Sequence, residues 1–157
     1  MTPIIADRYQ IYYREGYKYV LTRSHSHRLM FLRDLPDCEN EYSKIDGGVL
    51  VIFKYYAWDG CSGPTRDTDT NMRAGLVHDA LYQMIRLGLI PAYRKADIDK
   101  EFREICKQDG MAYLRRAAFY RGVEVFGGSS IDPDAEKKIK IAPIGRKCRW
   151  MPELEPA

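Results

Sequence analysis

The stretch TNMRAGLVHDALYQMIRLG, residues 70–88, predicts the central helix of the fold. It begins at a Thr-Asn pair of the kind that caps helices, and it ends at Gly88, with Pro91 beyond. At about 100° per residue, its apolar side chains share one broad face that should pack against the core: Ala74, Leu76, Val77, Ala80, Leu81, Met84 and Leu87. The opposite side carries His78, Asp79, Tyr82, Gln83 and Arg86, so it is either a solvated surface or a functional one.

Two features of that polar side favour a functional site. His78 and Tyr82 are one helical turn apart, so their side chains lie along the same strip. Asp79 is adjacent to His78 but points about a quarter of a turn away, so it should not simply be the partner of the imidazole. This divergence suits a base on one side of the helix and a cation ligand on the other.

Two more helices are predicted after the first. They are KADIDKEFREICKQDG, residues 95–110, and MAYLRRAAFYRGVEVFGG, residues 111–128, and each ends at glycine. In the earlier of the two, Ile98, Phe102, Ile105 and Cys106 follow the spacing of a buried stripe.

Asp99 flanks this stripe and should face protein, whereas Asp97 should face water on the far side with Glu101 and Glu104. A carboxylate at the edge of a core needs hydrogen-bond donors. If the first two helices pair antiparallel, His78 and Tyr82 are the natural donors to Asp99. An imidazole held in this way can act as a general base, and the simpler alternative is an Asp–Tyr bond that only ties two helices together.

The part of the chain before these helices is rich in strands. YQIYY (9–13), YKYVL (17–21) and GGVLVIFKYYAW (47–58) carry β-branched and aromatic residues, and REGYK and SKIDGG read as turns. The sequence therefore predicts one α+β domain over residues 1–128. It consists of a β-rich part (1–57), a loop (58–71) and a helical core (72–128), followed by an extended basic tail or late edge strand over 129–157.

Composition narrows the class of protein. The 157 residues are 45% hydrophobic and carry a net charge of +3 with mixed signs, so specific nucleic-acid binding is not expected. Neither a secretory signal nor a membrane span is predicted. The cysteines are scattered and form no CxxC pair, which argues against a zinc ribbon and favours reduced thiols: Cys38, Cys61, Cys106 and Cys148.

The loop WDGCSGPTRDTDTN, residues 58–71, has the composition of a cation-binding turn. Gly60 and Gly63 allow sharp turns that present backbone carbonyls, and calcium accepts both carbonyl and carboxylate oxygens. Asp79 together with carbonyls of the 58–63 turn would form such a site. Asp59, Asp67 and Asp69 add negative charge nearby.

Residues 49–127 resemble DUF1353, a phage and bacterial family of unknown function. The family pattern is a strand, a D-G/F-A/C-S-x-P turn, an H-D-x-L-Y helix and an A-D-rich helix ending in aromatic and glycine residues. The matching segments here are VIFKYYAWDGCSGP, LVHDALYQ, KADIDKEF and YRGVEVFGG. The resemblance implies a protein encoded by a phage or prophage.

The core also resembles the secreted phospholipase A2 superfamily, in which a glycine-rich calcium loop precedes an H-D-x-C-Y motif. The resemblance implies His78 as general base, Asp99 as its orienting carboxylate with Tyr82 bonded to it, and Asp79 as calcium ligand. Carbonyls of Trp58, Gly60 and Ser62 would complete the calcium site. Leu81 occupies the cysteine position of the motif, so the disulfides that tie the helices in that family are not expected.

The function implied by this resemblance is hydrolysis of lipid esters at a phospholipid surface, in the host cytoplasm or in the virion. Two alternatives stay open. The first is a non-enzymatic virion, tail or assembly component that contacts phage structural proteins and keeps the helices only as a scaffold. The second is a cysteine-dependent cell-wall hydrolase with Cys61 as nucleophile and His78 as base. His25 and His27 in SHSH could also form a metal pair, but a solvated turn or edge strand is the preferred interpretation.

Overall fold

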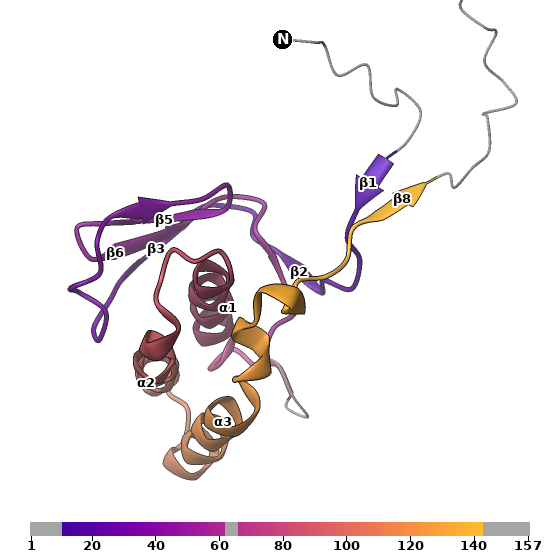
Figure 1. Ribbon diagram of the computed structural model, residues 1–157. Helices are drawn as coiled ribbons and strands as arrows, with labels where there is room; N and C mark the ends of the chain where they lie inside the picture. The colour runs from indigo at the N-terminus through magenta and orange to yellow at the C-terminus, as the bar shows by residue number, and fades with distance from the viewer. Residues whose placement is uncertain (1–10, 62–65, 143–157) are drawn as a thin grey trace, which may run out of the picture. The chain divides into compact units, whose positions relative to one another are not determined.

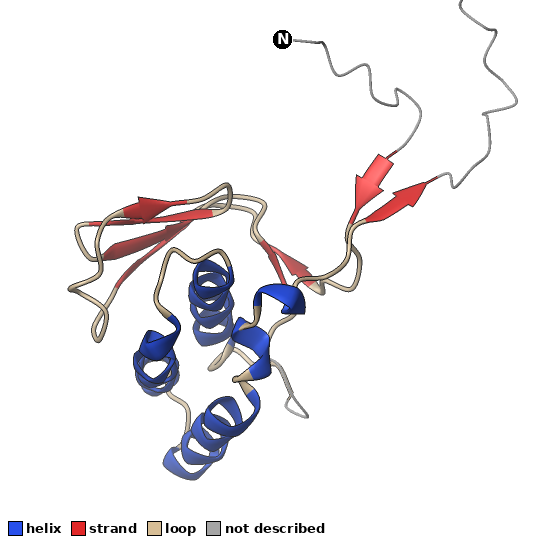
Figure 2. Ribbon diagram, viewed as in Figure 1, coloured by secondary structure: helices blue, strands red, loops and turns tan. Residues whose placement is uncertain are grey.

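The computed structural model describes residues 11–61 and 66–142 (Figures 1 and 2). Strands β1 to β7 lie in the N-terminal part, and the helices follow, so the predicted α+β class is confirmed. The strands are β1 (Ile11–Tyr13), β2 (Tyr19–Val20), β3 (His25–Arg28), β4 (Cys38–Glu39), β5 (Ser43–Asp46), β6 (Val49–Ile52), β7 (Ala57–Trp58) and β8 (Lys140–Ala142). The helices are α1 (Met72–Arg86), α2 (Lys95–Gln108) and α3 (Tyr113–Phe126), with 3-10 turns η1 (Ala92–Arg94), η2 (Ser129–Ile131) and η3 (Pro133–Ala135).

The chain divides into two compact units. One is Gly16–Glu136, and the other includes the described residues 11–15 and 137–142. In the second unit β1 pairs antiparallel with β8, and the Arg14 side chain donates a hydrogen bond to the Lys137 carbonyl at 2.8 Å. Of the two interpretations of the end region, the late strand is therefore the one found for residues 140–142.

A four-stranded antiparallel sheet, in the order β3-β6-β5-β4, forms one layer of the larger unit. Gly47 and Gly48 connect β5 to β6 with φ of 54° and 75°. Positive φ at both positions of a two-residue turn matches the twist of the strands it joins. The register places Ile45 opposite Leu50, and both side chains are buried on the inner face.

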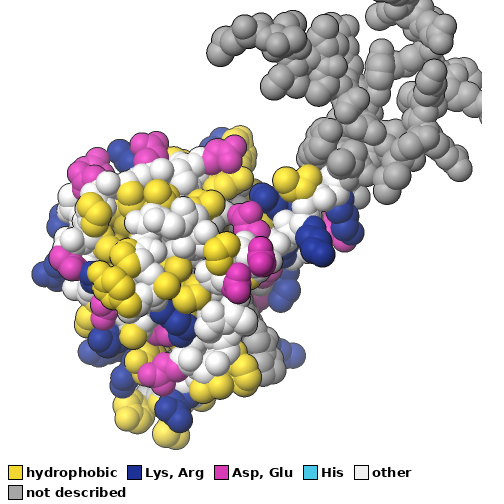
Figure 3. Space-filling model, in the orientation of Figure 1, with side chains coloured by type: hydrophobic (Ala, Val, Ile, Leu, Met, Phe, Trp, Pro, Cys, Tyr) yellow, Lys and Arg dark blue, Asp and Glu magenta, His cyan; other side chains and the backbone are white. Residues whose placement is uncertain are grey.

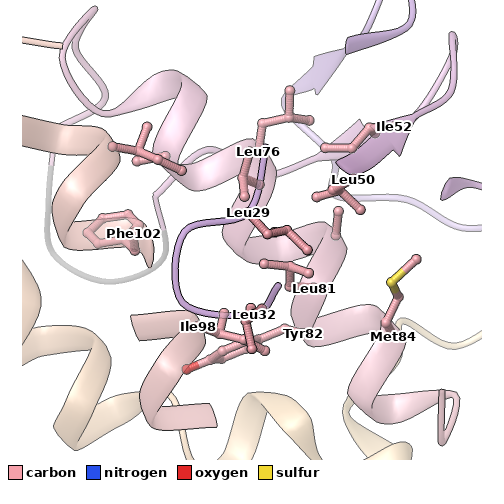
Figure 4. Packing of buried hydrophobic residues seen from close by; sticks show 14 of the residues in the cluster. Leu29, Leu32, Leu50, Ile52, Leu76, Leu81, Tyr82, Met84, Ile98 and Phe102 are labelled. Atoms are coloured by element: carbon pink, nitrogen blue, oxygen red, sulfur yellow. The ribbon is translucent and has the colours of Figure 1, made fainter. Parts of the chain in front are cut away.

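Helix α1 lies against this sheet and contacts α2 and η2 (Figure 1). Leu50 and Ile52 of β6 share one hydrophobic cluster with Leu29 and with Leu76 and Leu81 of α1 (Figure 4). Burying apolar area of this kind contributes roughly 25 cal/mol per Å², so this cluster stabilises the contact between sheet and helix.

Six of the seven residues expected on the core face of α1 are buried, but the opposite face is not solvated. His78, Tyr82 and Gln83 are only 8%, 2% and 9% exposed, because α2 and the segment after α3 cover the side opposite the sheet. Leu87, expected on the core face, is 46% exposed, because α1 ends at Arg86. The helix is therefore buried on nearly all sides.

Helices α1 and α2 run antiparallel, which is the condition under which His78 and Tyr82 were expected to donate to Asp99. Arg73 near the start of α1 bonds Asp109 just beyond the end of α2, with Nη2 and Oδ1 2.7 Å apart. Tyr82, further along α1, bonds Asp99 in the first half of α2. The predicted phase of α2 also holds, since the Asp99 side chain is 1% exposed and that of Asp97 is 30% exposed.

Glu101 contradicts the expectation that it faces water beside Asp97. Its side chain is fully buried and accepts hydrogen bonds from His27 Nε2 at 2.7 Å and from the amides of Met30 and Phe31 at 3.0 Å each. Asp97 is also not merely solvated, because Arg94 and Lys100 both contact its carboxylate at 3.0 Å. These contacts place His27 in the core, on an edge strand, as a hydrogen-bond partner of α2.

Helix α3 is the most exposed of the three, and none of its residues is fully buried. Phe119 and Val123 pack against the core, whereas Leu114 and Phe126 are 81% and 71% exposed. Hydrophobic side chains are visible at the lower end of the face drawn in Figure 3, where α3 lies. The chain then returns through η2 to α1, where Arg86 Nη1 donates to the Ser130 carbonyl at 2.8 Å.

Candidate active site

The two antiparallel helices bring a histidine and a carboxylate together. His78 Nε2 lies 3.1 Å from Asp99 Oδ1, and the hydroxyl of Tyr82 donates to the same oxygen at 2.7 Å. The rings of His78 and Tyr82, one turn apart on α1, have centroids 3.9 Å apart. The structure therefore assembles the three side chains that the helical spacing predicted.

A fourth side chain, Lys95, completes the surroundings of Asp99. Its Nζ lies 2.6 Å from Asp99 Oδ2, so the two carboxylate oxygens have different partners. Lys95 was not among the predicted site residues, although it is one turn before Asp99 on α2 and the i,i+4 spacing is a known signal for an ion pair.

The electrostatics of the pair favour a neutral imidazole beside an ionised carboxylate. Burial lowers the pKa of His78 below its usual value and outweighs the opposing hydrogen bond to Asp99. Burial raises the pKa of Asp99, but hydrogen bonds from His78, Lys95 and Tyr82 outweigh it, so the pKa is lower than usual. A neutral His78 must carry its proton on Nε2 to donate to Asp99, which leaves Nδ1 with the lone pair of a base.

His78 opens into a pocket of about 520 Å³. Apolar side chains from α2 and α3 line most of it: Phe102, Ala118, Phe119, Val123, Val125 and Phe126. Its polar lining includes His78, Asp79 and Tyr82. A base and a carboxylate in an apolar pocket can act on a polar bond next to a hydrocarbon group.

The loop before α1 is organised by Asp67. Its carboxylate accepts hydrogen bonds from the Cys61 amide and the Tyr19 hydroxyl, both at 2.9 Å. Gly60 has φ of +79°, and a Cβ there would meet Asp67 Oδ1 at 2.5 Å, so this position requires glycine. Asp67 was expected only to add negative charge near the loop. Its carboxylate instead fixes the loop through these hydrogen bonds.

The predicted calcium ligands are only partly brought together. Asp79 and Gly60 line the same pocket, and the missing side chain of Gly75 lets the Gly60 carbonyl approach α1, since a Cβ there would meet that oxygen at 3.3 Å. The Trp58 carbonyl instead accepts the Lys18 amide at 3.2 Å in the β2–β7 pair. Ser62 and Gly63 lie outside the described residues, and Asp59 does not line the pocket.

Within residues 11–61 and 66–142, no three His, Cys, Asp or Glu side chains gather as metal ligands. A calcium site made of one carboxylate and backbone carbonyls does not need such a group. The chemistry of Asp79 and the Gly60 carbonyl therefore fits a hard cation.

Cys61 also lines the pocket, but its environment is that of a structural thiol. It is 7% exposed, and Sγ donates to the Asn71 carbonyl at 3.4 Å. Burial raises the pKa of the Cys61 thiol, and the charges of Asp67 and Asp79 raise it further. Only a thiolate is a good nucleophile. Cys38 and Cys106 are likewise free thiols, and Cys148 lies outside the described residues.

Replacing Cys61 by serine should therefore keep most of any hydrolytic activity, because a protonated, buried thiol is not a nucleophile. The measurement is the initial rate on a chromogenic ester, with circular dichroism to establish the fold. Abolition of activity in a folded Cys61→Ser protein would favour the cysteine-hydrolase alternative.

Comparisons with known proteins found no matching family model, no matching curated protein and no matching solved structure. The resemblances noted in the sequence therefore stay predictions. None of the helices in the described part of the chain combines the length and the hydropathy that a membrane span requires.

Proposed function

We propose that this protein is a phospholipase A2-like hydrolase that cleaves ester bonds of lipids, with His78 as general base. The observation that carries the proposal is the His78–Asp99 pair, 3.1 Å apart, at an apolar pocket of about 520 Å³. The resemblance of the H-D-x-L-Y helix to the secreted phospholipases supports it. The apolar walls suit a fatty acyl chain, and His78 lines the same pocket.

In this mechanism Nδ1 of His78 takes a proton from water as the water oxygen bonds to the ester carbonyl carbon. The carbonyl π bond opens, and the tetrahedral intermediate then collapses with loss of the alcohol, which takes the proton from His78. Asp99 keeps the imidazole in the Nε2–H tautomer and stabilises the imidazolium that forms between the two steps. Tyr82 and Lys95 hold the carboxylate in the required orientation.

The comparison of Asp99→Asn with Asp97→Asn tests the proposal. Both changes are isosteric, remove one charge and lie in the same turn of α2. Asp99→Asn should lower the turnover number on the order of 10²-fold or more, because the amide cannot stabilise the imidazolium. Asp97→Asn should have little effect, because that carboxylate is part-exposed and its ion pairs in the described structure are with Arg94 and Lys100. Equal effects of the two variants on the hydrolysis of phospholipid or of a chromogenic ester would contradict the proposal that Asp99 of α2 orients His78.

We also propose calcium as a cofactor, held by Asp79 and the Gly60 carbonyl, with Trp58 and Ser62 as the remaining predicted ligands. When bound, the ion would supply positive charge for the substrate phosphate and the developing oxyanion.

Calcium at about 100 times its dissociation constant should raise the free energy of unfolding by roughly 2.7 kcal/mol. The measurement is the melting temperature in calcium and in chelator. Asp79→Asn should abolish the difference, and Asp69→Asn, in the same acidic loop region, should keep it. Identical melting temperatures for the wild type in calcium and in chelator would refute the metal assignment and leave the His78–Asp99 mechanism standing.

A further inference from the structure

Lys95 contacts both the carboxylate of Asp99 and the end of helix α3. Its ammonium lies 2.6 Å from Asp99 Oδ2 and 3.1 Å from the carbonyl oxygen of Val123, near the end of α3. The Glu124 carbonyl lies 3.5 Å from the same nitrogen. The side chain is 18% exposed, so these contacts are largely screened from solvent.

The end of α3 is a suitable partner for a cation. The last four carbonyls of a helix lack partners within the helix, and the helix dipole makes this end negative. Here Lys95, from the start of α2, caps the carbonyls of Val123 and Glu124. The same ammonium therefore neutralises a buried carboxylate and caps a neighbouring helix.

Gly127, directly after α3, allows this close approach. Its φ is −72°, so the position does not need glycine for its backbone conformation. A Cβ there would instead collide with the Tyr82 hydroxyl, would lie 2.5 Å from the Val123 carbonyl oxygen and would lie 3.2 Å from Lys95 Cε. Only a residue without a side chain lets the end of α3 reach the Tyr82–Asp99–Lys95 group at this depth.

The end of α3 is also a wall of the pocket, since Val123, Val125, Phe126 and Gly127 line it. We infer that Lys95 is a positioning residue that joins the pocket wall to Asp99, so that the orientation of His78 depends on the placement of the acyl-binding wall. The role in turnover rests on the proposed function. The bridge itself is a property of the fold and can be measured without any reaction.

The test compares Lys95→Met with Lys100→Met in the full-length chain. Lys100 is on the same helix, is 49% exposed and pairs only with Asp97 at 3.0 Å, so it is a matched control. Two NMR measurements report on the two ends of the bridge. The first is the chemical shift of the His78 Nε2 proton, which is bonded to Asp99. The second is the hydrogen-exchange rate of the Gly127 amide, which is bonded to the Val123 carbonyl.

In Lys95→Met we expect the His78 signal to shift and Gly127 amide exchange to accelerate about 10-fold or more, because the cap on α3 and the partner of Asp99 are both lost. Lys100→Met should leave both the chemical shift and the exchange rate unchanged. If Lys95→Met changes neither of them, the bridge is overturned. If it changes only one, the bridge is also overturned, because Lys95 would then act on one end alone.

If Lys95→Met does not fold, Gly127→Ala replaces it in the same measurements, because it disturbs the contact from the α3 side. The added methyl should displace α3 and move the His78 signal with Lys95 still present, and an unmoved signal overturns the coupling. In ester hydrolysis, Lys95→Met should lower the turnover number on short-chain esters on the order of 10-fold and raise KM only for long-chain esters. If the wild type hydrolyses no ester, the proposed function fails, and the two NMR signals still decide whether the bridge exists.

Discussion

Replacing His78 by alanine should lower kcat/KM for ester hydrolysis by about 10²- to 10⁴-fold, the range that general-base catalysis contributes. The expected loss is large because no other imidazole lines the pocket of the described structure. Asp99 keeps its hydrogen bonds from Tyr82 and Lys95 in the variant, so its charge stays compensated. The measurement is kcat/KM on a phospholipid and on a soluble ester.

Two further variants separate chemistry from packing. His78→Gln fills most of the space of the imidazole but cannot accept a proton at neutral pH, so its loss should match that of His78→Ala. His25→Ala removes a histidine of β3 that does not line the pocket, and it should keep activity near the wild-type level. A folded His78→Ala protein with activity within about 3-fold of the wild type would exclude the general-base role, since such a base contributes far more. It would favour the alternative of a scaffold without catalysis.

Glu101→Gln should lower the free energy of unfolding by about 2–4 kcal/mol, the largest stability loss expected from a single polar substitution here. The carboxylate of Glu101 has no exposure and accepts hydrogen bonds from His27 Nε2 and from the amides of Met30 and Phe31. An amide side chain has the same shape but no charge, and its NH₂ group meets a donor unless His27 changes to the tautomer in which Nε2 accepts. The remaining oxygen must then serve the Met30 and Phe31 amides alone, and the stronger bonds to a charged carboxylate are lost.

Glu104→Gln is the matched control for this prediction. Glu104 is on the same helix, its side chain is 32% exposed, and its ion pair with Lys107 is 3.6 Å long. The change should alter stability by no more than about 0.5 kcal/mol, as is usual for surface positions. The measurement is urea unfolding followed by circular dichroism. If the two variants unfold at the same urea concentration, then the contact between β3 and α2 does not depend on the Glu101 charge.

The sequence by itself determined the features that depend on one segment of chain. The Asp-Gly-Gly sequence predicted a turn before β6, because positive φ at two successive residues favours glycine. Residues 43–46, expected in the same turn, instead form strand β5. The apolar period of α2 placed Asp99 toward protein and Asp97 toward solvent. The one-turn spacing of His78 and Tyr82 then predicted that both would meet Asp99, and they do.

Only the tertiary structure decided which polar side chains are buried and what they bind. A helical period separates the faces of one helix, but it cannot show how many neighbours cover them. Helix α1 is therefore buried on its polar side as well, and Glu101 is buried through a bond to His27, 74 residues away in the chain. The second contact of Lys95 depends on the end of α3, 28 residues further on. Such partners are distant in sequence, and their positions follow from how the sheet and helices pack together.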